Sequence, residues 1–201
     1  MSELILLRHG QSQWNLENRF TGWVDVPLSE KGEAEARAAG EKLRGRRIDL
    51  LYTSVLKRAI DTATLALEVA GIVTPPTVRD AALNERMYGD LQGLNKAEAA
   101  IRWGDAQVKL WRRSYDVRPP GGESLADTAT RVLPFWESRI LPDLRAGKNV
   151  LVAAHGNSLR ALVMHLDGLS REQVLRLEIP TGVPLLYDIA LDGCVTGKRY
   201  L

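Results

Sequence analysis

Two of the three histidines in this chain lie in the same local setting. His9 and His155 each follow a short apolar run, at residues 4–7 and 150–154, and each precedes a glycine. Short apolar runs that end at a turn residue are typical of buried parallel strands, and ligands bind just beyond the carboxyl ends of such strands. If the two strands are neighbours, both imidazoles and the guanidinium of Arg8 meet at one edge of the sheet.

This cluster predicts phosphoryl transfer through a histidine. A neutral imidazole can attack phosphorus and form a phosphohistidine, which divides one transfer into two easier steps. The phosphoryl oxygens then need positive charge and hydrogen-bond donors around them. Arg8 supplies charge, Gly10 lets the backbone approach closely, and the hydroxyl of Ser12 can donate a hydrogen bond. A histidine that only satisfies backbone groups is the alternative, but the flanking Arg8 and Gly10 favour a site.

The second histidine motif precedes a predicted helix, whose first amides form an anion site. A protonated His155 would stabilise charge on the transferring group or hydrogen-bond to it. Residues 156–160 also come close to the G-x-S-x-G motif of serine nucleophiles, with Ser158 in the serine position. Arg160 stands where that motif has its final glycine, so a serine nucleophile is the less favoured alternative.

Two further charged residues complete the predicted chemistry. Arg58 falls near the start of a helix that follows a strand, at the same sheet edge. A cation there opposes the helix dipole, which indicates a bound anion; a solvated arginine is the alternative. Glu85 provides the carboxylate that the site otherwise lacks, as general acid and base, unless it only forms a surface pair with Arg86.

These residues need a sheet to position them. We expect a single α/β domain over residues 1–201, with three layers in which helices flank a mostly parallel central sheet. Residues 84–122 mix aromatics, arginines and glycines, and they predict a small helical cap, or insertion, with a helix near 95–104. Strands are expected at 4–7, 48–52, 77–79, 150–154, 185–190 and 198–201. Further helices are expected from Ser29 to Arg44, from Ser54 to Ala70, from Ser124 to Leu144, from Asn157 or Ser158 onward, and from Ser170 onward.

Composition narrows the class of protein. The chain has 201 residues and a formal net charge of only +2, so we expect no nucleic-acid partner and treat the five tryptophans as packing groups. A single cysteine, Cys194, favours a reducing compartment, and no signal peptide or membrane span is expected, so we predict a cytoplasmic protein. No metal-ligand spacing and no nucleotide-binding motif is present, so no metal is expected.

The chain resembles the histidine phosphatase superfamily and, within it, the 2,3-bisphosphoglycerate-dependent phosphoglycerate mutases. The Arg8-His9-Gly10 signal is common to the superfamily, whereas the segments 18–23, 91–96 and 111–113 resemble the mutase branch. The resemblance covers nearly the whole chain. It implies interconversion of 3- and 2-phosphoglycerate, primed by 2,3-bisphosphoglycerate and without a metal.

The resemblance also implies roles for single residues. His9 is the phosphorylated residue, Glu85 carries the proton, and His155 stabilises the transferring group, which Arg8 and Arg58 clamp. The remaining substrate-contacting positions are expected to be Asn15, Thr21, Gly22, Tyr88, Lys96, Arg112, Arg113, Gly156 and Asn157, beside Ser12.

Alternatives to mutase activity remain open at this stage. A phosphatase would use the same nucleophile with water as acceptor and act on small phosphate esters, and a non-catalytic phosphate-binding protein is a third class. Longer family members have extra residues after Pro120 and a longer C-terminal tail, regions that can cover the site or form subunit contacts. Because both regions are short in this chain, two questions stay open: how well water is excluded from phosphorylated His9, and whether the protein is a homodimer or homotetramer.

Overall fold

A computed structural model describes all residues, 1–201, and contains one six-stranded sheet with strand order β3-β2-β4-β1-β5-β6. The pairs β1–β4, β2–β4 and β2–β3 are parallel, whereas β1–β5 and β5–β6 are antiparallel. The sheet is therefore mostly parallel, as predicted. The strands are β1 (Ser2–Arg8), β2 (Leu50–Thr53), β3 (Thr77–Arg79), β4 (Val150–Ala154), β5 (Leu185–Ile189) and β6 (Val195–Tyr200).

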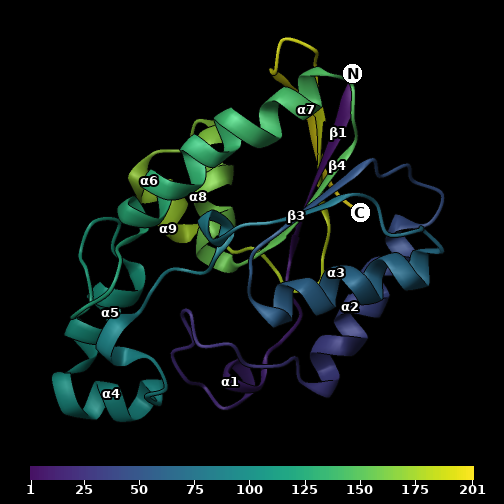
Figure 1. Ribbon diagram of the computed structural model, residues 1–201. Coiled ribbons are helices and arrows are strands. Elements are labelled where there is room, and N and C mark those ends of the chain that lie inside the picture. Colours follow the sequence, from purple (N-terminus) through teal and green to yellow (C-terminus); the bar gives the residue numbers. More distant parts are fainter.

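Helices cover both faces of this sheet (Figure 1). One face packs against α2 and α3, and the other against α6, α7, α8 and α9. The helices of these two layers are α2 (Glu30–Leu43), α3 (Lys57–Ala70), α6 (Leu125–Phe135), α7 (Leu141–Arg145), α8 (Gly156–Asp167) and α9 (Arg171–Arg176). The predicted three-layer α/β fold is confirmed. No helix is both long and apolar enough to cross a membrane.

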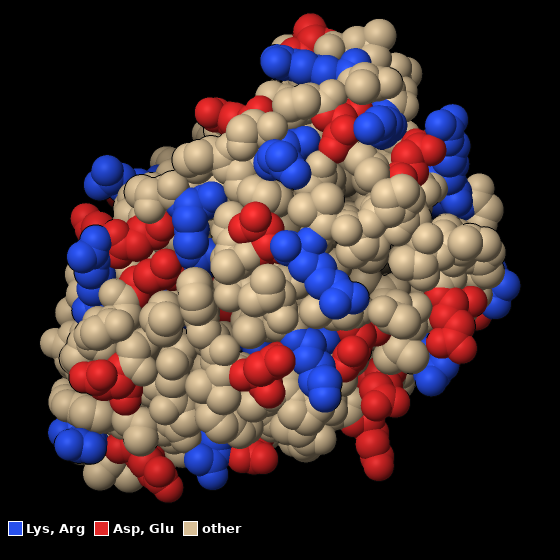
Figure 2. All heavy atoms as spheres, in the orientation of Figure 1, with Lys and Arg blue, Asp and Glu red and all other residues tan.

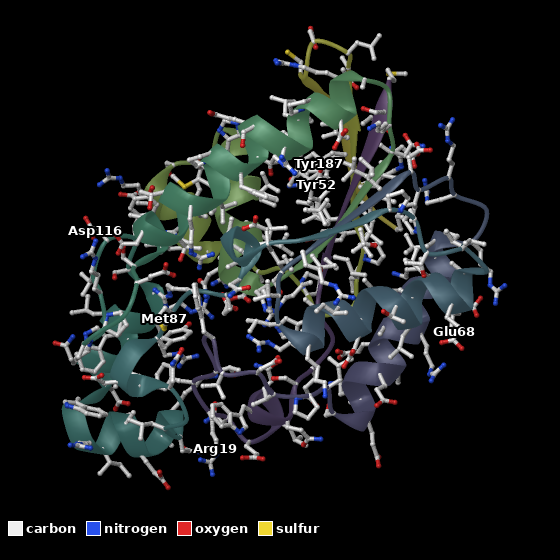
Figure 3. All side chains as sticks on the ribbon, viewed as in Figure 1. Arg19, Tyr52, Glu68, Met87, Asp116 and Tyr187 are labelled. Atoms are coloured by element: carbon white, nitrogen blue, oxygen red, sulfur yellow. The ribbon has the colours of Figure 1, made fainter.

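Successive residues of a strand pack against opposite faces of the sheet. Along β1, Leu4 and Leu6 enter the larger core, under α6 and α8, while Ile5 and Leu7 enter the core under α2 and α3. This is the two-residue period of a strand that is buried on both sides. Tyr52 and Tyr187 belong to the larger core, and Figure 3 shows both beside the sheet.

The segment for which a cap was predicted contains two helices that lie together at one end of the sheet, far from the N-terminus (Figure 1). It contains α4 (Lys96–Trp103), as predicted, and also α5 (Asp105–Arg113), which was not predicted. Gly104 separates the two helices with a φ of +83°, a conformation that glycine adopts freely. The cap has its own small core, in which Phe20 from the loop after β1 packs with Leu91, Ala99, Val108 and Trp111.

Short turns connect the cap and the helices. They are α1 (Gln13–Leu16), the 3₁₀ turns η1 (Ala81–Leu83) and η2 (Gly89–Leu91), and the π-helical turn η3 (Trp136–Ile140). The expected helix from Ser124 to Leu144 is therefore α6, η3 and α7 in succession. Pro134 interrupts the regular hydrogen bonds because it lacks an N–H, and the wider turn η3 follows it.

The loop after β1 approaches α2 very closely. A Cβ atom on Gly10 would lie 2.2 Å from the carbonyl oxygen of Gly32, so only glycine fits there. Ser29 begins α2 as predicted, since its Oγ accepts a hydrogen bond from the N–H of Gly32 at 3.1 Å. The close approach of Gly10 to Gly32 fixes the backbone next to His9.

Candidate active site

A polar pocket lies at the carboxyl ends of β1, β2 and β4 and extends to the cap. Only two of its 17 lining residues are hydrophobic. The lining residues are Arg8, His9, Asn15, Arg19, Phe20, Thr21, Gly22, Arg58, Glu85, Tyr88, Lys96, Arg112, Arg113, Gly156, Asn157, Arg160 and Glu178. The structure thus brings most of the predicted site residues to one cavity.

The two predicted histidines lie side by side at this site; His9 lines the pocket, whereas His155 is fully buried behind the lining residues. Because β1 and β4 are neighbours in register, with Arg8 opposite Ala154, His9 and His155 leave the sheet side by side. Their ring centroids are 4.9 Å apart, with an angle of 59° between the ring planes. Nδ1 of His9 lies 2.6 Å from the carbonyl oxygen of Gly10, which requires a proton on Nδ1. Nε2 of His9 therefore carries the lone pair that a nucleophile needs.

The protein environment favours neutral imidazoles. Burial lowers the pKa of His9 well below its ordinary value of 6.5, and the charges of Arg58 and Arg8 lower it further. Burial, Arg58 and His9 likewise lower the pKa of His155. His9 is therefore ready to attack at neutral pH. The expected positive charge on His155 is not favoured by the protein's own groups, which favour a neutral ring.

Ser54 holds the ring of His155 through Nε2. Its Oγ accepts a hydrogen bond from the N–H of Leu56 at 3.2 Å and lies 2.7 Å from Nε2 of His155. A hydroxyl can donate one hydrogen bond and accept two, so this contact suits either tautomer of His155, whose Nδ1 is buried with no protein partner. The prediction that Ser54 caps α3 was wrong. The helix begins at Lys57 after Leu56, because the Ser54 side chain is engaged by a histidine 101 positions away.

Arg8 and Arg58 bring positive charge that no carboxylate pairs with. Arg8 donates from Nη1 to the carbonyl of Ile179 at 2.7 Å, and Arg58 donates to the carbonyls of Gly22 and Val24 at 2.8 and 3.0 Å. The Nε–H groups of both arginines are buried without a partner. Burial lowers the pKa of Arg58 to about 10, so it remains charged at neutral pH. Arg58 is only 1% exposed, which rules out the solvated arginine considered above.

Glu85 is held in the site by one of its two oxygens. Oε1 accepts hydrogen bonds from the N–H of Asn157 at 3.0 Å, from Nδ2 of Asn157 at 2.9 Å and from the N–H of Arg86 at 2.8 Å. Oε2 makes no hydrogen bond within the protein and lies beside Gly156. Burial alone would raise the pKa of Glu85, but these hydrogen bonds and the charges of Arg8 and Arg58 outweigh it and lower the pKa. These contacts therefore favour an ionised Glu85 with one free oxygen.

The cap contributes a second set of cations. Lys96, Arg112 and Arg113 line the side of the pocket that α4 and α5 form. Lys96 lies 5.9 Å over the ring of Phe20, and Arg113 pairs with Glu178 at 3.0 Å. A ligand with more than one anionic group can thus meet Arg8 and Arg58 at the sheet and these cations at the cap.

Ser12, a predicted site residue, and Ser158, the serine of the less favoured alternative, both lie outside the pocket. Ser12 is fully buried and begins α1, where its Oγ accepts from the N–H of Asn15 at 3.2 Å and donates to Oδ1 of Asn15 at 2.9 Å. Ser12 was expected to contact substrate directly; instead it holds Asn15, which does line the pocket. Ser158 is buried in the first turn of α8, where its Oγ accepts from the N–H of His155. That placement argues against a serine nucleophile.

Four lining residues were not predicted: Arg19, Phe20, Arg160 and Glu178. Arg19 and Phe20 belong to a segment that carried the family resemblance, and Arg160 ends the second histidine motif, so the sequence contained a signal for these three. Arg160 donates to the carbonyl of Leu177 at 2.9 Å. Glu178 lies in a segment without helix or strand and had no recognisable signal.

The buried histidines predict a loss of stability in mild acid. Because the pKa values of His9 and His155 are lowered in the folded protein, the unfolded chain binds more protons below pH 6.5. The free energy of unfolding should fall as pH drops through this window, by up to about 1.4 kcal/mol per pH unit for each histidine. The lowered pKa of Glu85 acts in the same direction, but only near and below its ordinary value of 4.5.

Urea unfolding between pH 7 and pH 5 measures this dependence. The variants His9→Asn and His155→Asn should each show a shallower slope than the wild type over the same range. An unchanged slope in both variants would mean that these imidazoles do not carry the pH dependence.

Comparison with known proteins places this fold and site in a class. Residues 4–194 match the histidine phosphatase superfamily (branch 1), and the chain belongs to this family. It is 61% identical over 200 residues to the 2,3-bisphosphoglycerate-dependent phosphoglycerate mutase of Methylobacterium radiotolerans, covering 98% of this chain and 94% of that protein. The mutase of the same description from a Chelativorans strain is 57% identical, with 98% and 97% coverage.

Solved structures with the same fold include a phosphatase. A mycobacterial glucosyl-3-phosphoglycerate phosphatase superposes with a TM-score of 0.82 and 30% identity, covering 100% of this chain and 97% of that one. The fold is thus compatible with both reactions, whereas the higher sequence identity is to proteins described as mutases.

Proposed function

We propose that this protein is a 2,3-bisphosphoglycerate-dependent phosphoglycerate mutase that interconverts 3- and 2-phosphoglycerate. The observation that carries the proposal is one pocket that combines a neutral histidine nucleophile, a carboxylate with a free oxygen and two sets of cations. The 61% identity to a protein of that description supports the substrate. The Nε–H groups of Arg8 and Arg58, which lack a protein partner, suit the oxygens of a phosphoryl group.

The proposed cycle begins with His9 phosphorylated on Nε2. The substrate's free hydroxyl attacks phosphorus, the Nε2–P bond breaks, and Oε2 of Glu85 takes the hydroxyl proton. The product of this step is bisphosphoglycerate. After it turns in the pocket, Nε2 of His9 attacks the other phosphorus, and Glu85 returns its proton to the leaving oxygen. Glu85 must start ionised in this cycle, which agrees with its lowered pKa.

The cations have separate tasks in this proposal. Arg8, Arg58 and His155, which donates from Nδ1 in the tautomer that this cycle requires, surround the transferring group and stabilise its charge in the transition state. Lys96, Arg112 and Arg113 bind the part of the substrate that is not reacting, and this binding orients the substrate. When the bisphosphate turns, its two ends exchange places between the two sets of cations.

The overall assay measures conversion of 3-phosphoglycerate with and without bisphosphoglycerate, in the presence of a chelator. We expect conversion that depends on the bisphosphate and is insensitive to the chelator. Release of inorganic phosphate faster than formation of 2-phosphoglycerate would favour the phosphatase alternative. Loss of activity with the chelator would contradict the metal-free mechanism.

The cap cations provide a second test of the substrate. The double substitution Arg112→Ala and Arg113→Ala should raise KM for phosphoglycerate about 10- to 100-fold, because two charged hydrogen bonds to an anion are lost. Hydrolysis of 4-nitrophenyl phosphate, which has one anionic group, should change much less. Arg102→Ala is the matched control, since Arg102 lies on the same cap but stacks on Trp103 outside the pocket. Equal, small losses with both substrates would contradict the mutase assignment.

We also propose a cytoplasmic location. Its support is the single exposed cysteine, Cys194, which forms no disulfide in the chain. Detection of the activity in the soluble fraction after cell lysis, and not in the culture medium, tests this location.

A further inference from the structure

The segment that carries Glu85 has little secondary structure of its own. Residues 84–88 run between η1 and η2 without a helix or a strand. Glu85 must nevertheless place Oε2 accurately, because a catalytic group displaced by about 1 Å can lose a hundredfold in rate. Some other part of the molecule has to fix this segment.

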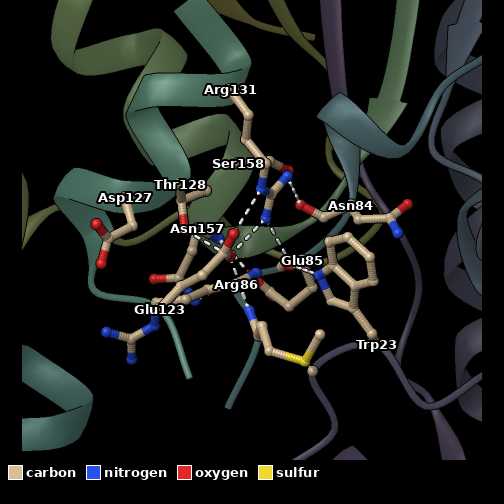
Figure 4. Close-up of polar contacts among 12 residues, drawn as sticks. Trp23, Asn84, Glu85, Arg86, Glu123, Asp127, Thr128, Arg131, Asn157 and Ser158 are labelled. Atoms are coloured by element: carbon tan, nitrogen blue, oxygen red, sulfur yellow. Dashed lines mark hydrogen bonds and ion pairs between the residues drawn. The ribbon is translucent and has the colours of Figure 1, made fainter. Parts of the chain in front are cut away.

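Arg131, on α6, is the centre of the contacts that fix it (Figure 4). Its Nη1 donates to the carbonyl oxygens of Ala82 at 2.8 Å and Asn84 at 3.0 Å, and its Nη2 donates to the carbonyl oxygen of Glu85 at 2.8 Å. One guanidinium thereby ties the backbone of residues 82, 84 and 85 to α6. Arg131 does not line the pocket, so any effect on the reaction must pass through another residue.

Glu123 holds the guanidinium in this position. Nε and Nη2 of Arg131 donate to Oε1 and Oε2 of Glu123, each at 2.9 Å, in the two-pronged geometry that arginine forms with carboxylates. Oε2 of Glu123 also accepts the N–H of Met87 at 3.0 Å. The pair is therefore bonded to the backbone on both sides of Glu85. The two side chains are only 18% and 22% exposed, which limits screening by water.

Trp23 completes the support. Its Nε1 donates to the carbonyl oxygen of Glu85 at 2.6 Å, and the guanidinium of Arg131 lies 5.5 Å over its ring. The backbone carbonyl of Glu85 is thus fixed by two donors, while the carboxylate on the other side is fixed by Asn157. Between these supports, the free Oε2 has little room to move.

We propose that Arg131, clamped by Glu123, is a positioning residue for proton transfer by Glu85. This inference rests on the proposed function, because it assumes that Glu85 carries the proton. In this role Arg131 supports proton transfer by Glu85 and does not bind phosphate. Lysine cannot replace it, because an ammonium cannot form a two-pronged pair with Glu123 while donating to three carbonyls.

The test compares two reactions with different demands for a proton. Mutase turnover expels an alkoxide and needs Glu85, whereas the burst of 4-nitrophenolate that accompanies phosphorylation of His9 by 4-nitrophenyl phosphate expels a stable anion and does not. Arg131→Met and Arg131→Lys should lower kcat of the mutase about 10- to 100-fold and change the burst rate less than about threefold. Glu123→Gln should show the same split with a smaller loss.

A double substitution and a control make the result specific. In a Glu85→Gln background, Arg131→Met should lower mutase activity by less than about a further twofold, because the effects of residues that act as one unit are not additive. Arg118→Met is the matched control. Arg118 forms a similar two-pronged pair with Asp127 near the start of α6, but it is 66% exposed and makes no bond to residues 81–87. This variant should show no split.

Several outcomes would overturn the proposal. Equal losses of burst and mutase rates in the Arg131 variants, at a temperature where circular dichroism shows them folded, would make Arg131 a general structural residue. A full additional loss in the Glu85→Gln background would have the same meaning. If Glu85→Gln itself shows no split, the proton-transfer role of Glu85 fails, and the role of Arg131 fails with it. If Glu85→Gln shows the split and Arg131→Met does not, only the role of Arg131 fails.

Discussion

Replacing His9 by asparagine should abolish both mutase and phosphatase activity, with a loss of about 10⁴-fold or more, as expected when a covalent nucleophile is removed. Asparagine is close in size and neutral, so the loss reports on chemistry and not on packing. The second readout is covalent labelling. Bisphosphoglycerate carrying ³²P should leave an acid-labile label on the wild-type protein and none on the His9→Asn variant.

His165→Asn provides the control for this experiment. His165 is exposed on α8 and lies near the ring of Trp136, with centroids 6.5 Å apart, outside the pocket. This variant should keep both activity and labelling. A label that persists on His9→Asn would point to a different nucleophile and contradict the proposed cycle.

Replacing Glu85 by glutamine should lower mutase turnover about 10²- to 10⁴-fold, the range for loss of a general acid and base. Glutamine can keep the hydrogen bonds from Asn157 to its side-chain oxygen, so the loop should stay in place. The amide group in the position of Oε2 cannot accept the proton of the substrate hydroxyl. The rate at which 4-nitrophenyl phosphate phosphorylates His9 should fall far less, because 4-nitrophenolate leaves without protonation.

Rapid-mixing measurement of the 4-nitrophenolate burst separates these two effects. Glu85→Asp is a useful companion variant, since it keeps the carboxylate but withdraws it by one methylene, and it should fall between wild type and Glu85→Gln. Equal losses of burst and turnover in Glu85→Gln would mean that Glu85 acts by binding or charge, not by proton transfer.

Local patterns in the sequence predicted most elements well. The strands that end before His9 and His155 and the start of α2 at Ser29 lie where expected. Other boundaries differ by a few residues: the strand expected at 48–52 is Leu50–Thr53, and that expected at 198–201 is Val195–Tyr200. Strand ends depend on pairing with neighbours, which the local pattern does not contain.

The exceptions have physical reasons. Ser54 has the residue type of a helix cap, but its hydroxyl serves His155 instead, and α3 starts three residues later without a side-chain cap. The second cap helix was not predicted; α5 is stabilised by packing Val108 and Trp111 against Phe20, a contact that local residues do not reveal. Tertiary contacts decide both cases.

The sequence by itself singled out the candidate nucleophile, its arginine and the second histidine, because each lies in a short motif whose chemistry can be recognised locally. For Glu85 the local pattern left a surface pair with Arg86 open, and only the family resemblance implied a role in proton transfer. Only the tertiary structure decided that β1 and β4 are neighbours, and hence that the two rings lie 4.9 Å apart. It also decided the charge states and supports of these residues, since burial, Ser54 and the Arg131–Glu123 pair act across many positions of the chain. Such contacts depend on which surfaces pack together, and no local stretch of residues encodes that.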